Sequence, residues 1–218
     1  MNTVLDLARA AHNRGDYEEA LRLYQEVLSS DPRDFDALYL TGFLYLQQKV
    51  WPAADIFLRR ALAERPAALD ALYYHGHVLH SLERYEEALL AFQAMLALHP
   101  AIAEAHLGRA SALMLLHRYE EALQAIDMVL RLLPQSAEAW NNKGNILAQL
   151  WRSDEALPCY DKAMALAPKD AGIASHRALT LFELKRYEEA ASAFAHVLEL
   201  DPNFGYASAN LLYSRLHA

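Results

Sequence analysis

The spacing of proline constrains the fold of this chain more than any other feature of its sequence. A proline recurs every 34 residues, at Pro32, Pro66, Pro100, Pro134, Pro168 and Pro202. Alanine stands twelve places before each of these prolines, and a large apolar residue stands eight places before each. A fixed period of this length is typical of repeat architectures, in which every repeat is one small structural unit. We therefore expect six copies of one unit.

Each unit has the features of two antiparallel helices, here called helix A and helix B. The alanine, together with a Gly or Ala at position 8 of each unit, leaves little side chain between the helices, so their axes can approach closely. Proline lacks an N–H and disfavours helix in the residue before it, so it separates one hairpin from the next. Helix A is expected over about positions 2–14 and helix B over about positions 18–30. Because one hairpin cannot bury its apolar face alone, neighbouring hairpins must stack.

Composition fits a folded helical protein and excludes several functions. The chain is 54% hydrophobic and 22% charged, and its net charge of −8 makes nucleic acid a poor partner because phosphate would be repelled. The single cysteine, Cys159, allows no internal disulfide. No apolar run is long enough for a membrane span, and Asp6 and Arg9 interrupt the apolar stretch that a signal peptide needs. We expect a cytoplasmic protein without membrane contact.

Taken together, these positions resemble the tetratricopeptide repeat (TPR) family. The unit at 137–170 carries the family pattern most clearly, with Trp140, Gly144, Ala156, Tyr160, Ala163 and Pro168. The resemblance implies an all-α, right-handed superhelical TPR solenoid of α-α hairpins. It divides the chain into six units and a C-terminal capping helix, at residues 1–34, 35–68, 69–102, 103–136, 137–170, 171–204 and 205–218.

Two further prolines fall within the helix B segments. Pro52 stands where its helix B begins, a position that tolerates proline because that N–H is unpaired in any case. Pro158 lies deeper, behind the candidate N-cap Ser153. It is expected to cost one hydrogen bond or to shift the start of its helix.

In a stacked array of this kind, the helix A segments line a concave groove, which is the candidate site for a protein or peptide partner. Positions 2, 5, 6, 9, 12 and 13 share one helix face, and in the middle units they carry aromatic and aliphatic residues edged by acids. Exposed apolar area and aromatic anchors are typical of interfaces. The candidate groove residues are Asp36, Tyr39, Phe43, Asp70, Tyr73, His77, His80, Glu104, Leu107, Met114, Glu138, Asn141, Asn142 and Asn145.

The groove chemistry favours an apolar or basic ligand. Chaperone-binding TPR proteins hold a C-terminal carboxylate with a clamp of Lys and Asn, whereas acids, Tyr and Leu stand at the clamp positions here. The acids at position 2 have a second interpretation, because negative charge also stabilises a helix N-terminus. We expect an apolar or basic peptide, or an amphipathic partner helix, in the groove.

Enzyme signatures are absent from the sequence, which contains no phosphate-binding glycine loop and no nucleophile elbow. His77 and His80 lie three residues apart and could share a metal ion, but zinc normally needs a third ligand with a fixed second shell. We therefore expect no catalytic residue, no metal and no cofactor.

Two other functions stay open. The run Trp-Asn-Asn-x-Gly-Asn at 140–145 and the segment 211–217 resemble the TPR arm of bacterial O-GlcNAc transferase-like (SPINDLY-type) glycosyltransferases, which implies a substrate-recruiting arm. Of the asparagine ladder in that family, only Asn142 is present. Alternatively, the apolar residues of the C-terminal helix favour self-association: Leu211, Leu212, Tyr213 and Leu216.

Overall fold

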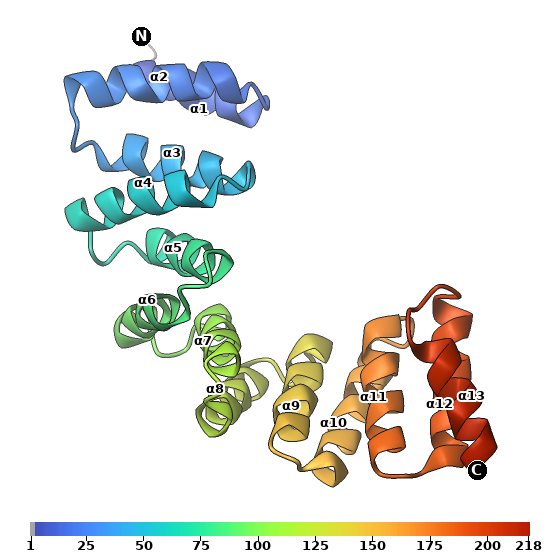
Figure 1. Cartoon of the computed structure of the whole chain (residues 1–218). Helices are drawn as coiled ribbons and strands as arrows, with labels where there is room; N and C mark the ends of the chain where they lie inside the picture. Colours follow the sequence, from blue (N-terminus) through green and yellow to red (C-terminus); the bar gives the residue numbers. More distant parts are fainter. Residues whose placement is uncertain (1–2) are drawn as a thin grey trace. The chain divides into compact units, whose positions relative to one another are not determined.

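The computed structural model describes residues 3–218, and all regular structure in that range is helical (Figure 1). The helix A elements are α1 (Val4–Asn13), α3 (Phe35–Gln47), α5 (Leu69–Ser81), α7 (Ala103–Leu115), α9 (Ala137–Gln149) and α11 (Ala171–Glu183). The helix B elements are α2 (Tyr17–Ser30), α4 (Trp51–Glu64), α6 (Tyr85–Leu98), α8 (Tyr119–Leu132), α10 (Ser153–Leu166) and α12 (Tyr187–Leu200), followed by α13 (Ala207–His217). The all-α TPR fold is confirmed. From the second unit on, each helix A begins and ends one position earlier than expected, and every helix B begins one position earlier.

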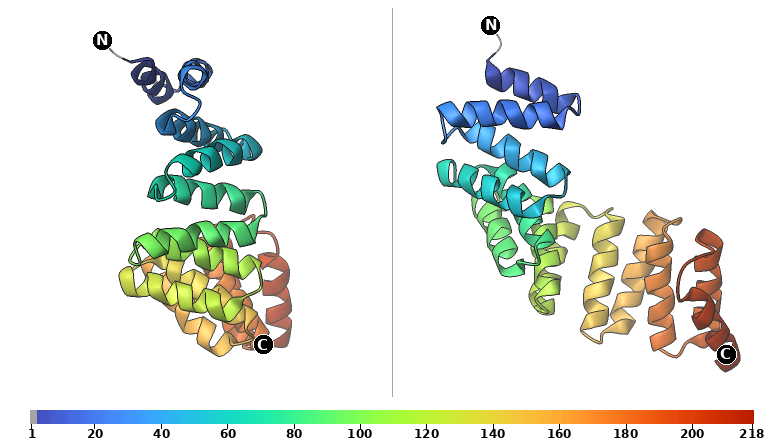
Figure 2. Two further views of the ribbon diagram at one scale, coloured as in Figure 1. Left: turned by 90° about the vertical axis from the view of Figure 1, so that its left-hand side faces the viewer. Right: turned by 45° about the horizontal axis from the view of Figure 1, so that its top comes forward.

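The chain forms two compact units, residues up to Leu116 and residues from His117, and each is described by itself. Within each unit, consecutive helices pack against one another (Figure 2). The large residue eight places before each repeat proline lies in the core and is at most 2% exposed: Tyr24, Leu58, Phe92, Ile126, Tyr160 and Phe194.

Small residues at position 8 make this packing possible. A Cβ added to Gly42, Gly76 or Gly144 would lie 2.7, 2.8 and 2.5 Å, respectively, from the core side chain of its own helix B. These distances are shorter than packed atoms tolerate, so glycine is required for the observed approach of the two helices. The expectation of small residues where backbones meet is confirmed.

The turn between helix A and helix B has one conformation throughout the chain. Position 15 has a positive φ in each of the six repeats, but only the first repeat uses glycine there, with a φ of 79° at Gly15. In the second repeat, Lys49 N–H donates to the Leu46 carbonyl and Val50 N–H to the Tyr45 carbonyl, both at 2.9 Å. This is the Schellman pattern that closes a helix C-terminus. The other position-15 residues, with φ between 56 and 59°, are Lys49, Glu83, His117, Trp151 and Lys185.

Of the two outcomes expected at Pro158, a shifted helix start is wrong, and the loss of one hydrogen bond follows from the missing N–H of proline. α10 is continuous, and it begins at Ser153, in register with the other helix B elements. Ser153 is the first helical residue, and the N-cap is Arg152, so Ser153 is not the cap. Pro158 lies on the exposed side of α10, where water can satisfy the carbonyl that loses its partner. Pro52 is the second residue of α4, as expected for a proline at a helix start.

The C-terminal helix α13 packs against α12 and adds Ala207 and Leu211 to the core there. Its other side is open, because Leu212 is 61% exposed and Leu216 is 73% exposed. Across residues 3–218, no helix combines the length and the apolar character that crossing a membrane requires.

Candidate partner-binding surfaces

An aromatic cluster occupies the helix A face of α3 and α5. We define it as Phe35, Tyr39, Phe43, Tyr73, Tyr74 and His77. On α3 its members are four residues apart, so their rings lie in one row: Phe35 and Tyr39 stack at 5.8 Å between centroids, and Tyr39 and Phe43 at 6.4 Å. Tyr74 of α5 lies 4.7 Å from Phe43 and 6.2 Å from Tyr39, which joins the two helices. The cluster is completed by His77, whose ring lies 4.4 Å from that of Tyr73.

The aromatic row was expected to face solvent, but its candidates Tyr39, Phe43 and Tyr73 are half-buried. The rings cover part of one another, so each offers an edge or one face to a partner. Phe35 and Tyr74 were missing from the candidate residues. Tyr74 occupies position 6, which lies on the groove stripe, and Phe35 precedes Tyr39 by one helical turn, so both positions carried a usable signal.

The acids at position 2 differ in how they are paired. Asp36 forms an ion pair with Arg9 at 3.1 Å, so its charge is already compensated. Asp70 and Glu104 are exposed, and neither has an ion-pair partner among residues 3–218. Burial raises the pKa of Tyr39 to about 12, with a further contribution from the charge of Asp70, so this phenol stays protonated. All three acids stand in the first turn of their helices, where the helix-terminus interpretation also applies.

The remaining candidate groove residues of the first compact unit lie on α5 and α7. His80 Nε2 lies 3.0 Å from Ser111 Oγ, which links the two helices. Burial lowers the pKa of both His77 and His80, so neither ring is protonated near neutral pH. No group of three metal-ligating side chains occurs within the described residues. Leu107 and Met114 on α7 are half-buried.

A polar pocket adjoins the aromatic cluster at α1. His12, 9% exposed, lies between the Tyr24 hydroxyl, 3.1 Å from Nδ1, and Gln47 Oε1, 2.8 Å from Nε2. Its ring is 5.9 Å from that of Phe43, so the pocket shares a wall with the cluster. The imidazole is engaged on both nitrogens and therefore has a structural role.

The asparagine patch on α9, in the second compact unit, consists of Asn141, Asn142 and Asn145, and not all of these side chains are engaged. Asn141 Oδ1 lies 2.9 Å from His176 Nδ1, and Asn145 Oδ1 accepts from the Tyr160 hydroxyl at 2.8 Å. The half-buried side chain of Asn142 makes no hydrogen bond among the described residues. His176 was not among the candidates, although position 6 lies on the groove stripe. Glu138 is exposed at the N-terminal end of α9.

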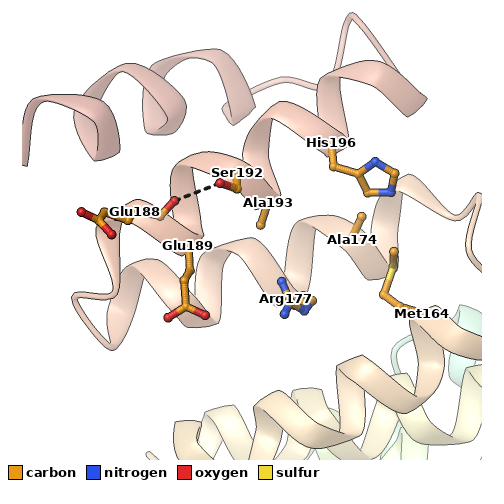
Figure 3. A pocket seen from close by; sticks show the side chains of 8 residues that line it. All are labelled: Met164, Ala174, Arg177, Glu188, Glu189, Ser192, Ala193 and His196. Atoms are coloured by element: carbon orange, nitrogen blue, oxygen red, sulfur yellow. Dashed lines mark hydrogen bonds between the residues drawn. The ribbon is translucent and has the colours of Figure 1, made fainter. Parts of the chain in front are cut away.

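A separate pocket of about 550 Å³ lies between α10, α11 and α12 (Figure 3). Two of its charged side chains are already paired, since Arg177 Nε lies 2.6 Å from Asp161 and Glu189 accepts from Arg186 at 2.7 Å. Ser192 Oγ donates to the Glu188 carbonyl, as the dashed line marks. With these groups engaged, we do not include this pocket among the candidate partner sites.

Comparison with known families agrees with the hairpin geometry. Two tetratricopeptide repeat models match this chain, one at residues 75–137 and the other at 137–170 and 171–204. Together they cover 75–204, more than half of the chain. The chain belongs to the tetratricopeptide repeat family. A model of subunit 3 of the anaphase-promoting complex (cyclosome) matches residues 13–95. The family consists of protein-interaction modules, and that general role applies to this chain.

Solved TPR structures share the fold. MamA is 22% identical over 78% of this chain and 92% of its own, with a TM-score of 0.72. MamA from Desulfovibrio magneticus RS-1 is 24% identical over 76% of this chain and 93% of its own, also with a TM-score of 0.72. YrrB, described as a TPR protein with an unusual peptide-binding site, is 27% identical over 76% of this chain and 85% of its own, with a TM-score of 0.72. No curated protein matches the sequence.

Proposed function

We propose that this protein is an interaction scaffold that binds an apolar or basic peptide, or an amphipathic partner helix, on the helix A face of α3, α5 and α7. The aromatic cluster carries the proposal. Its rings, half-buried except for that of His77, are held by contacts with one another, so they lose little freedom when a ligand covers their remaining surface. Large, pre-ordered aromatic side chains of this kind supply most of the binding energy in protein interfaces.

The charge around the cluster favours a basic ligand. Asp70 and Glu104 are exposed and unpaired, whereas the charge of Asp36 is compensated by Arg9. A ligand that places Lys or Arg next to Asp70 and Glu104 gains modest attraction and, above all, orientation. An acidic tail would meet uncompensated negative charge.

The test is capture of partners from a lysate by the full chain, compared with the double variant Tyr39→Ala/Tyr73→Ala. The matched control is Trp151→Ala, which removes an aromatic side chain that is 94% exposed and lies in a turn outside this face. We expect the double variant to lose one specific partner that the wild type and the control retain. Equal capture by all three proteins would refute the proposal. The captured partner is then titrated at rising salt and against Asp70→Asn/Glu104→Gln, and salt-independent binding would contradict the electrostatic part.

A second candidate function, a substrate-recruiting arm of a glycosyltransferase-like protein, is favoured by Asn142. Its half-buried amide is free of hydrogen bonds within the described residues, so it has two donors and an acceptor for an extended backbone. The hypothesis of a substrate-recruiting arm predicts that Asn142→Ala weakens capture of an extended substrate chain and that Tyr39→Ala/Tyr73→Ala does not.

A third candidate, self-association, is favoured by α13. Leu212 and Leu216 are 61% and 73% exposed on the same side of this helix, an arrangement that a monomer leaves in contact with water. A second copy of the chain would cover this surface through its own α13.

A further inference from the structure

A pocket of about 360 Å³ opens between the N-terminal ends of α9 and α11, within the second compact unit. Glu138 and Asn141 of α9 line one side, and Gly172 and His176 of α11, with its N-cap Asp170, line the other. We call it the α9–α11 pocket. It is lined by two carboxylates, an imidazole and an amide, and none of its lining residues is Lys or Arg.

Gly172, which lines the pocket, interrupts the series of acids at position 2. The four preceding units carry a carboxylate there: Asp36, Asp70, Glu104 and Glu138. A Cβ at Gly172 would lie 3.1 Å from Asp170 Oδ1, so a larger residue at this position would crowd the N-cap carboxylate.

The free polar atoms of Glu138, Asp170 and His176 are hydrogen-bond acceptors, and the amide N–H groups of Asn141 are the free side-chain donors. Asp170 Oδ1 accepts from the Ile173 N–H at 3.0 Å, which leaves Oδ2 available. Glu138 is exposed and has no ion-pair partner among the described residues. With Asn141 Oδ1 as acceptor, His176 Nδ1 carries the ring proton and Nε2 has a free lone pair. Burial lowers the pKa of His176 and outweighs the opposing effect of Asp170, so the ring is neutral near pH 7.

The electrostatic balance of the pocket is negative. The N-terminal ends of α9 and α11 each add a partial positive charge of about half a unit, and the C-terminal end of α10 at Ala167 adds a partial negative charge of similar size. The two full charges of Glu138 and Asp170 outweigh this sum. A cation that donates several hydrogen bonds therefore matches the site, whereas a carboxylate is repelled and an apolar group leaves the acceptors unsatisfied.

We propose that the α9–α11 pocket receives a basic side chain, arginine or lysine, of a partner peptide. The proposal rests on the scaffold function above and adds a specificity site in the other compact unit. A partner would then be recognised by an apolar or aromatic contact at α3 and α5 and, separately, by a basic residue at α9 and α11. No contact between the two compact units is required.

The probe is N-acetyl-arginine amide, added to the isotope-labelled full chain and followed by amide chemical shifts. Saturable shifts are expected at the Gly172 backbone and the Asn141 side-chain amide, and N-acetyl-lysine amide should act similarly. N-acetyl-citrulline amide, which has nearly the same shape without the charge, should produce none. Asp170→Asn keeps a capping side chain, and Glu138→Gln alters an exposed residue, so both variants should fold. Each should weaken binding about two- to fivefold, as expected for an exposed ion pair.

The matched control is Glu18→Gln, which removes an exposed acid from the first turn of α2, outside both proposed binding surfaces, and it should leave the affinity for N-acetyl-arginine amide unchanged. Equal shifts with arginine and citrulline probes would overturn the proposal, and so would unchanged affinity in both pocket variants. Absence of any shift up to the solubility limit of the probes would also overturn it. None of these results bears on the scaffold proposal, which is tested by Tyr39 and Tyr73 in the other unit.

Discussion

Asp55 of α4 replaces an apolar residue of the repeat with a buried carboxylate, and its removal should destabilise the helix that carries half of the aromatic cluster. The residue is 5% exposed. Its Oδ1 accepts from His75 Nε2 at 2.8 Å, and its Oδ2 accepts from Arg84 Nη1 at 2.7 Å and also from Arg59. His75 lies on α5, next to Tyr74 of the cluster. The other units carry Leu21, Leu89, Leu123, Leu157 and Ala191 at this position.

The exposure of the partners determines the size of the effect of Asp55→Ala. Removing one member of a fully buried ion pair costs about 3–5 kcal/mol, because the other charge is left without a partner. Here the side chains of Arg59 and Arg84 are 58% and 32% exposed, so water can solvate them after the change. His75, 13% exposed, loses its partner in a buried place. We expect a loss of about 2 kcal/mol in the free energy of unfolding, near the value of one hydrogen bond to a charged group.

The assay is urea unfolding followed by circular dichroism, with amide hydrogen exchange on α5 as a local measure. Repeat arrays can unfold in several steps, so the exchange rates identify the helix that loosens. The control is Asp55→Leu/His75→Leu, which replaces the buried carboxylate and its most buried partner with apolar side chains and should be less destabilising than Asp55→Ala. A loss below about 0.5 kcal/mol, within the range of an ordinary surface substitution, would refute the reasoning.

The same network makes a prediction about pH. Burial raises the pKa of Asp55, but the hydrogen bonds from His75 and Arg84 and the nearby arginine charges lower it by more than burial raises it. The pKa of Asp55 therefore lies below its ordinary value of 3.8. The network therefore stabilises the fold fully above that ordinary pKa, and the contribution is lost as pH falls through the lower value of the folded state. The stability difference between wild type and Asp55→Ala should shrink on acidification below 3.8. A difference that grows instead would contradict the assignment.

Three further outcomes are expected. Gly144→Ala should lower the melting temperature, since the new Cβ would lie 2.5 Å from the buried Tyr160 ring. Overpacking costs about 1–3 kcal/mol, which exceeds the roughly 1 kcal/mol that alanine gains in helix propensity. An unchanged melting temperature would contradict the close approach. Cys159 should react slowly with thiol reagents in the native protein and rapidly in urea, because burial raises the pKa of its thiol; equal rates would show it to be accessible. The wild type should form a dimer in light scattering that Leu212→Ser/Leu216→Ser abolishes, and a monomeric wild type would exclude self-association.

Helix positions were predictable because their causes are local. The alanine and the proline of each repeat specify where two helices approach and where a hairpin ends, so most helix termini fall within one position of the expected place. The same reasoning did not decide between the two outcomes expected at Pro158, where α10 stays continuous and in register despite the missing N–H. It also did not foresee that non-glycine residues such as Trp151 hold a positive φ, since the turn geometry is imposed by the two packed helices.

The candidate sites were predicted only in outline. The periodicity placed Tyr39 and Tyr73 on the same face of their two helices, but the contact of Tyr39 with Tyr74 depends on the distance between α3 and α5. Likewise, the residues 138, 141 and 142 were recognised as polar, while their roles depend on which groups approach them from α11. The carboxyl of Glu138 stays free, the amide oxygen of Asn141 is engaged by His176, and the amide of Asn142 is left open.

By itself, the sequence determined the repeat, the helices and the face on which they present their variable residues, because a 34-residue register and helical spacing follow from order along the chain. The tertiary structure alone decided which of those residues pair. Asp36 is compensated by Arg9, Asp55 is held by His75 and Arg84, and Gly172 leaves a pocket beside Asp170. Such pairings join residues of adjacent helices or repeats, and their distances depend on how closely the hairpins pack, which no local pattern encodes.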